Sequence, residues 1–183
     1  MGNDTVRGVI PAVDGIRNYK EFLESELPVC VLMNVHLALL DSVFRGAGEK
    51  DKKIILHIDR INGLSDDEYG AEYVSQKYAP AGAISIKPAV ITALKRKRVT
   101  AIQRVFLIDS FALSRSAEAV KRASPDFVEV MPGPLPDLVP TLKEALGDDL
   151  IAGGLIPDLR YAERLLESFR AVTMAFSKIR RPG

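Results

Sequence analysis

Short apolar segments rich in valine and isoleucine recur along the chain, about every twenty to twenty-five residues. They occupy residues 9–13, 29–33, 54–59, 82–86, 100–107, 127–130, 150–152 and 171–174. Strands that are almost continuously apolar are buried on both faces, which is typical of a parallel sheet covered by helices. The segments between them carry charge at helical spacing, and near residue 40 the apolar side chains fall on one helical face: Leu37, Leu40, Val43 and Phe44.

Helix-start signals occur in several of these charged segments. Ser65 with Glu68 three residues later has the spacing of a capping box, so we expect Ser65 to be an N-cap. Pro88 suits the first position of a helix, because proline lacks the N–H that would be unpaired there. Pro136-Asp137 and Pro157-Asp158 are expected to open the last two full helices in the same way.

This alternation predicts an α/β fold of eight strands and seven intervening helices. Eight such units that close on themselves form a TIM-like (βα)8 barrel. The 183 residues are short for that fold, and only residues 175–183 follow the last strand, so we expect one domain over residues 1–183 with a truncated last helix. The alternative is an open doubly wound sheet, which needs fewer strands and no closure.

Composition narrows the class of protein further. The chain has 47% hydrophobic and 27% charged residues, as in an ordinary globular protein. A single cysteine excludes an intramolecular disulfide and a zinc finger. Without a signal sequence or a long apolar run, the expectation is a cytoplasmic protein that does not enter the membrane. The net charge of +1 restricts any RNA binding to a local patch.

In a barrel, functional groups gather where the strands end. Gly153 and Gly154 follow the seventh strand, where backbone N–H groups can bind a phosphate; an ordinary left-handed turn is the alternative. His57 and Asp59 alternate in phase and face the same way, either as ligand contacts or as a buried histidine with a capping aspartate. Thr173 is the polar residue of the eighth strand.

Four further polar residues lie on the middle strands. Lys87 ends the fourth strand and is either a ligand cation or a solvated lysine. Gln103 and Glu129 lie within apolar strands, where a polar group is costly unless it meets a ligand or a structural partner. Arg104 neighbours Gln103 and must face the opposite side of the strand, unless the strand bulges.

Two basic clusters could contact nucleic acid. The first is Lys95-Arg96-Lys97-Arg98, at the end of the fourth helix, and the second is the tail from Lys178 to Arg181. Cations at the end of a helix also interact favourably with its dipole, so the first cluster has a structural explanation as well. In a barrel it would lie on the face opposite the ligand pocket.

Several motifs together resemble one family. The chain contains, in this order, Leu56-His57-Ile58-Asp59, Ala101-Ile102-Gln103-Arg104, Leu107-Ile108-Asp109-Ser110, Glu129-Val130-Met131-Pro132-Gly133 and Ala152-Gly153-Gly154-Leu155-Ile156. This series resembles the bacterial glycerol uptake operon antiterminators, over nearly the whole chain. The resemblance implies a small barrel that binds glycerol 3-phosphate and the leader mRNA of glycerol operons. It also implies a pocket of His57, Asp59, Gln103, Arg104, Glu129, Gly153 and Gly154.

The chain departs from the family pattern at three places. Asn34 stands where the family often has aspartate, Ile86-Lys87 replaces a Thr-Arg pair, and Thr173-Met174-Ala175 replaces a Thr-Ser pair. We expect a regulator that is not an enzyme, needs no cofactor or metal and promotes transcription antitermination. The alternative is an enzyme acting on a phosphorylated C3 compound at the barrel mouth. A truncated last helix would leave part of the wall uncovered, which makes a homo-oligomer an open expectation.

Overall fold

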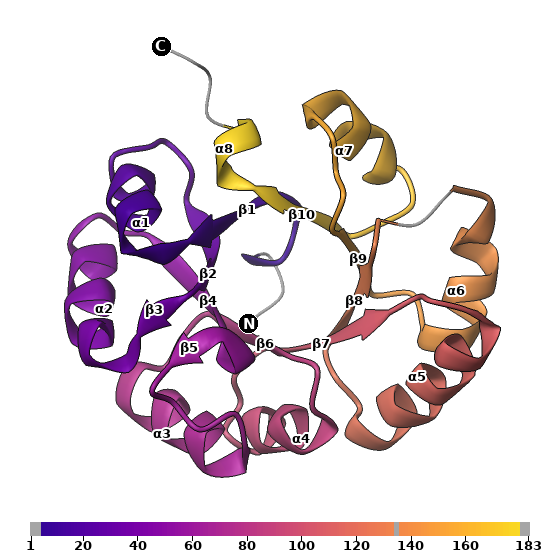
Figure 1. Cartoon of the computed structure of the whole chain (residues 1–183), viewed down its shortest axis with the longest axis horizontal. Helices are drawn as coiled ribbons and strands as arrows, with labels where there is room; N and C mark the ends of the chain where they lie inside the picture. The colour runs from indigo at the N-terminus through magenta and orange to yellow at the C-terminus, as the bar shows by residue number, and fades with distance from the viewer. Residues whose placement is uncertain (1–4, 134–135, 180–183) are drawn as a thin grey trace.

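Eight parallel strands close into a barrel in a computed structural model that describes residues 5–133 and 136–179 (Figure 1). The strands, neighbour by neighbour around the barrel, are β1 (Gly8–Asp14), β10 (Ala171–Ala175), β9 (Leu150–Gly153), β8 (Phe127–Met131), β7 (Ala101–Phe106), β6 (Gly82–Ser85), β4 (Lys53–His57) and β2 (Val29–Met33). The predicted TIM-like barrel is therefore confirmed, and the open sheet is wrong. Two short strands, β3 (Val35–His36) and β5 (Ile61–Asn62), pair separately beyond the ends of β2 and β4.

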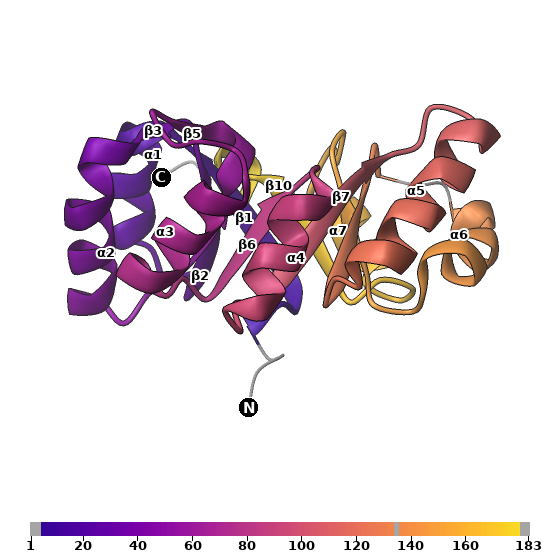
Figure 2. The same ribbon diagram turned by 90° about the horizontal axis from the view of Figure 1, so that it is seen from below.

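Helices form the outer layer of the barrel, as Figures 1 and 2 show. They are α1 (Gly15–Leu23), α2 (Leu40–Glu49), α3 (Glu68–Tyr78), α4 (Pro88–Arg96), α5 (Ser110–Ala123), α6 (Val139–Leu146), α7 (Leu159–Leu165) and α8 (Phe176–Ile179). The four-residue α8 is the short last helix that the sequence predicted. Within the described residues, every helix is too short or too polar to cross a lipid bilayer.

The expected helix starts are confirmed at α4 and α7 but are wrong at α3 and α6. Asp158 is the N-cap of α7, whereas Pro136–Leu138 form a 3-10 turn and α6 begins only at Val139. Pro88 is the first residue of α4, as expected. The prediction that Ser65 caps α3 is wrong, because Asp67 is the N-cap and accepts hydrogen bonds from the backbone of Tyr69 and Gly70. The Ser65 hydroxyl instead donates to the Asp67 carboxylate. A carboxylate two residues further along therefore takes the capping role, and it also interacts favourably with the helix dipole.

The barrel interior has its own apolar core. Side chains of alternate residues point inward, since successive residues of a strand face opposite sides. The apolar layer comprises Ile10, Val31, Ile55, Ile84, Ile102, Phe127, Ile151 and Ala171. Two residues further along five of these strands, the same phase brings polar residues and a glycine inward, above that layer: His57, Arg104, Glu129, Gly153 and Thr173. Strand periodicity thus positions a polar layer at the barrel mouth.

Candidate functional site at the barrel mouth

Glu129 is the central acceptor of the polar layer. Its side chain is fully buried and accepts hydrogen bonds at both oxygens. Arg104 Nε donates to Oε2 at 2.6 Å, and Thr173 Oγ1 donates to Oε1 at 2.5 Å. A buried carboxylate is tolerated only when it is paired and hydrogen-bonded, and these two donors from β7 and β10 meet that requirement for Glu129.

His57 is held neutral by its neighbours. Arg104 Nη1 lies 2.5 Å from His57 Nε2, and a guanidinium can only donate, so Nε2 must accept. The proton of the neutral ring is therefore on Nδ1, which is buried without a hydrogen-bond partner, 3.7 Å from Asp59 Oδ2. Burial, with the charges of Arg104 and Arg60, lowers the pKa of His57 from 6.5 to about 3.

Asp59 links the ends of two strands rather than facing open space. Its carboxylate accepts from the Ser85 hydroxyl at 2.5 Å and from the backbone N–H of Ile86 at 2.9 Å. Ser85 is completely buried at the end of β6, and its hydroxyl also accepts from the Lys87 N–H. Asp59 and Ser85 thus fix the ends of β4 and β6, and the sequence motifs did not single out Ser85.

The glycine pair packs directly against the polar layer. A Cβ on Gly153 would lie 2.6 Å from Thr173 Oγ1 and 2.8 Å from Glu129 Oε1, so only glycine fits beside this hydrogen-bonded pair. Gly154 has a φ of +73°, which favours glycine, and its carbonyl accepts from the Gly133 N–H at 2.9 Å. The two glycines bring the backbone after β9 close to the interior of the barrel.

A cavity of about 430 Å³ opens at the mouth beside these residues. Three cationic residues, Arg60, Arg104 and Lys178, line it together with the carboxylate of Asp14. Its remaining lining residues are Ala12, Met33, Met131, Gly154, Leu155, Ile156, Thr173, Met174 and Ala175. The Lys178 ammonium donates to the Ile156 carbonyl at 2.7 Å, which holds the cation over the loop after β9. The excess of positive charge suits an anionic ligand of modest size.

A chain of hydrogen bonds fixes the opposite wall of the mouth. Arg60 Nε donates to Asn34 Oδ1 at 3.2 Å, and Asn34 Nδ2 donates to Asp14 Oδ1 at 2.8 Å. The asparagine can serve both neighbours because an amide both accepts and donates, whereas an aspartate at this position could not donate to Asp14. Asp14 enters the cavity from the end of β1, Arg60 from a 3-10 turn and Lys178 from the four-residue α8, where periodicity carries little signal.

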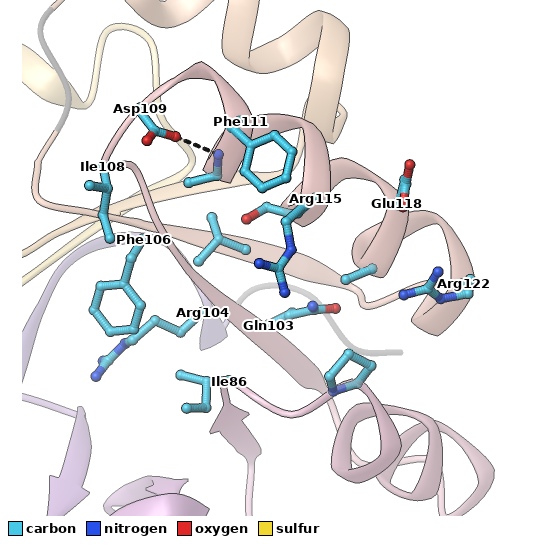
Figure 3. Close-up of a pocket in the computed structure, with 15 residues that line it drawn as sticks. Ile86, Gln103, Arg104, Phe106, Ile108, Asp109, Phe111, Arg115, Glu118 and Arg122 are labelled. Carbon is cyan, nitrogen blue, oxygen red and sulfur yellow. Dashed lines mark hydrogen bonds between the residues drawn. The ribbon is translucent and has the colours of Figure 1, made fainter.

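The structure gathers most of the predicted site residues and separates two of them. His57, Arg104, Glu129, Gly153, Gly154 and Thr173 lie together, with Asp59 adjoining them. Lys87 lies outside the 430 Å³ cavity and forms a 2.7 Å ion pair with Asp66. Gln103 faces away from the barrel interior, as its neighbour Arg104 takes the inward position, and it lines a second cavity against α5 (Figure 3).

The basic cluster at the end of α4 is largely balanced by carboxylates. Lys95 pairs with Asp126, while Arg96 and Lys97 lie 3.7 and 3.8 Å from a Glu72 oxygen. Arg98 follows in a left-handed conformation, with φ of 59°. In the second basic cluster, Lys178 lies at the mouth, and Arg180 and Arg181 are outside the described residues. Among the described residues, no group of three or more His, Cys, Asp and Glu side chains could hold a metal ion.

The depressed pKa of His57 predicts a loss of stability in acid. The folded state binds the proton only near pH 3, whereas the unfolded chain binds it near pH 6.5, so acid favours unfolding. The contribution of His57 to the free energy of unfolding is fully present above about pH 6.5. Between pH 8 and pH 5 we expect this contribution to fall by about 2 kcal/mol. Urea unfolding at several pH values measures it, and His57→Gln should remove this part of the pH dependence. Identical pH dependence in both proteins would contradict the assignment.

Comparison with known sequences identifies the family. Residues 9–179 match the family described as glycerol-3-phosphate responsive antiterminators. The chain belongs to this family. Solved structures agree: the glycerol uptake operon antiterminator regulatory protein of Listeria monocytogenes is 30% identical, with a TM-score of 0.84 over 94% of this chain and 95% of that one. A glycerol uptake operon antiterminator-related protein of Thermotoga maritima is 26% identical, with a TM-score of 0.80 over 93% and 96%.

Two further proteins are similar to this family member, one in sequence and one in fold only. The Escherichia coli protein YgcP is 25% identical over 150 residues, which is 82% of this chain and 78% of YgcP. An aldolase called QR15 is only 15% identical, with a TM-score of 0.68 over 93% and 91% of the two chains. Similarity at that level shows the shared barrel alone, since one fold supports many unrelated functions.

Proposed function

We propose that this antiterminator family member is a glycerol 3-phosphate-responsive regulator that binds the leader mRNA of glycerol operons and so promotes transcription antitermination. The mouth cavity carries the proposal, because three cations line a small cavity beside a buried polar layer in which Arg104 and Thr173 both donate to Glu129. Its volume is within the range of about 300–1,000 Å³ that is common for small-molecule sites.

The two ends of glycerol 3-phosphate would find different surroundings in this cavity. A phosphate fits near Lys178 and the backbone of Gly154 and Leu155, where an ammonium and close-lying peptide groups are available. Hydroxyl groups, which both donate and accept, suit the side of Asp14 and Arg60. Arg104 also lines the cavity, and its guanidinium, which contacts Glu129 and His57, would be available to the ligand as well.

The state of the carboxylates supports a regulator rather than an enzyme. Glu129, which could serve as a base in a triose-type reaction, is buried in an ion pair with Arg104 and also accepts from Thr173. Asp59 is occupied by Ser85 and Ile86 in the same way. Proton abstraction needs a carboxylate free to approach the substrate, and both carboxylates are engaged in bonds that hold the barrel together.

A thermal-shift titration with glycerol 3-phosphate tests the ligand. At about 100 times its Kd, a ligand that binds only the folded state adds about 2.7 kcal/mol of stability, so a clear rise in Tm is expected. Glycerol and inorganic phosphate are the controls.

Gly154→Asp should abolish this ligand-induced rise in Tm, because it adds a negative charge and a side chain that would contact Met131 in the mouth. Gly48→Asp, on an exposed part of α2 with free space around it, should keep it. If inorganic phosphate alone raised Tm as much as glycerol 3-phosphate does, the site would not be specific for the polyol part of the ligand.

A gel-shift titration tests the RNA-binding half of the proposal. Leader RNA that contains the terminator should bind, with an affinity that changes on adding glycerol 3-phosphate, since coupling requires different ligand affinities in the two RNA-binding states. If the Lys95–Arg98 cluster contacts phosphates, its replacement by alanines should flatten the salt dependence. If the protein bound glycerol 3-phosphate but did not shift the RNA, it would be a ligand sensor that acts on another partner. Turnover of a phosphorylated C3 compound would instead favour an enzyme.

A further inference from the structure

Helix α5 is unusually exposed for a helix of a barrel wall. Among its 14 residues only Ala123 is buried, whereas the nine-residue α4 beside it buries four side chains. Phe111 on α5 is 69% exposed, and Ile108 in the loop before it is 84% exposed. Large apolar groups exposed next to one another mark an interaction site more often than an ordinary surface.

A groove of about 530 Å³ runs along the same helix, between α5, β7 and the start of α4 (Figure 3). Its apolar rim includes Ile86 and Phe106, which are 45% and 48% exposed. On the side of α5, three small residues line the groove among larger side chains of the same helix: Ala112, Ser116 and Ala119. At its floor, the Gln103 side chain is buried and its Oε1 has no hydrogen-bond partner. A partner that enters the groove could supply the missing donor.

The outer face of α5 carries both signs of charge in a regular order. Phe111, Arg115, Glu118 and Arg122 are separated by four, three and four residues, so they form one stripe along the helix. Figure 3 shows Phe111, Arg115 and Arg122 along the helix beside the groove. Arg115 lies over the Phe111 ring, 5.8 Å from its centroid. Within the described part of the chain, none of the three charged residues of the stripe forms an ion pair.

We propose that this surface binds a second copy of the chain, with the two α5 helices antiparallel across a two-fold axis. In such a contact each residue meets a residue equally far on the other side of the axis. An axis that passes between Ser116 and Ala117 brings Arg115 opposite the partner's Glu118. The same axis brings Phe111 opposite the partner's Arg122, which pairs an aromatic face with a guanidinium. Two-fold symmetry forms each of these contacts twice.

The mixed charge favours a protein copy over RNA as the occupant. RNA presents a uniformly negative backbone and would be repelled by Glu118, which lies between the two arginines of the stripe. An antiparallel second stripe pairs Arg115 and Glu118 with opposite charges on both copies, while Arg122 meets the Phe111 ring. The apolar rim around Ile108 and the groove would be covered in the same contact. This inference does not depend on the ligand or the RNA of the proposed function.

A charge-swap experiment in solution tests the proposal. Sedimentation equilibrium of the wild-type protein should show a dimer, and Arg115→Glu or Glu118→Arg should each weaken self-association by at least tenfold, because like charges then face each other. An equal mixture of the two single variants should associate as a heterodimer, since both cross-pairs are again of opposite charge. The double variant Arg115→Glu/Glu118→Arg should recover the homodimer. Lys121→Glu, on α5 but outside the stripe, is the matched control and should dimerise normally.

The outcomes separate the proposal from its rivals. Unchanged thermal unfolding of the single variants shows that they fold, which surface substitutions allow. A wild-type protein that stays monomeric at about 100 μM would overturn the proposal, because a stable interface of this kind should be populated there. Single variants that dimerise as well as the wild type would also overturn it. If a monomeric wild type bound leader RNA and Arg115→Glu abolished that binding, the surface would belong to RNA instead.

Discussion

Replacing Arg104 with methionine is expected to destabilise the protein by about 3–5 kcal/mol. Methionine resembles the aliphatic part of arginine in size but cannot donate to Glu129, whose carboxylate is fully buried. The variant would leave Glu129 with the Thr173 hydroxyl as its remaining donor and with an uncompensated charge in the barrel. His57 would lose its partner at Nε2 in the same step. Such a loss is a large part of the total stability of a domain.

Urea unfolding with a double-mutant cycle measures this effect. Arg104→Met/Glu129→Gln should recover much of the lost stability, because glutamine removes the buried charge and its amide can still accept from Thr173. Glu129→Gln alone should cost less than Arg104→Met alone, as arginine at the mouth remains close to solvent. The ion pair would not have the assigned role if Arg104→Met cost less than about 1 kcal/mol, or if the double variant were no more stable than Arg104→Met alone.

Gly153→Ala is expected to cost about 1–3 kcal/mol and to abolish the stabilisation by glycerol 3-phosphate. The new methyl group would lie 2.6 Å from Thr173 Oγ1 and 2.8 Å from Glu129 Oε1, so it must separate this hydrogen-bonded pair or displace the strand. The backbone of Gly153 does not lie in the left-handed region, so the cost arises from overlap alone. Because the residue adjoins the mouth cavity, the displacement would also disturb the lining at Gly154 and Thr173.

Gly48→Ala is the matched control for this substitution. Gly48 lies in α2, is exposed, and has no atom near the position of an added Cβ. There alanine should be neutral or raise stability by up to about 1 kcal/mol, since glycine weakens a helix interior. The ligand-induced rise in Tm should stay as in the wild type. A Gly153→Ala variant as stable as the wild type, with the full ligand response, would show that the mouth tolerates a methyl group at this position.

Neighbouring residues of strand β7 contribute to two different surfaces of this family member. Arg104 points into the mouth and contacts Glu129, whereas Gln103 points outward into the groove beside α5. Arg104 also lines the groove as well as the mouth cavity. The proposed ligand site and the proposed dimer surface are adjacent through this one strand.

The repeated alternation of apolar runs and amphipathic segments determined the fold class by itself. Eight runs became the eight strands of the barrel, because a strand that is buried on both faces leaves a continuous apolar signature. The predicted strand over residues 54–59 ends at His57, so the 3-10 turn Ile58–Arg60, and not strand phase, brings Asp59 to 3.7 Å from His57. The glycine pair at the end of β9 marked the mouth. The sequence did not determine the N-cap of α3, because Ser65 and Asp67 both have a side-chain oxygen that could cap the helix. In the structure the Asp67 carboxylate is the cap.

Only the tertiary structure decided which of two adjacent polar residues faced the interior. The sequence of β7 requires Gln103 and Arg104 to face opposite sides, but the inward choice depends on Glu129 and His57, which come from other strands. Lys87 forms an ion pair with Asp66 outside the mouth cavity, while Arg60 enters the cavity from the 3-10 turn after β4 and Lys178 enters it from α8. Such contacts join residues far apart in the chain, so they depend on barrel closure and strand register, whereas periodicity reports only which residues share a face.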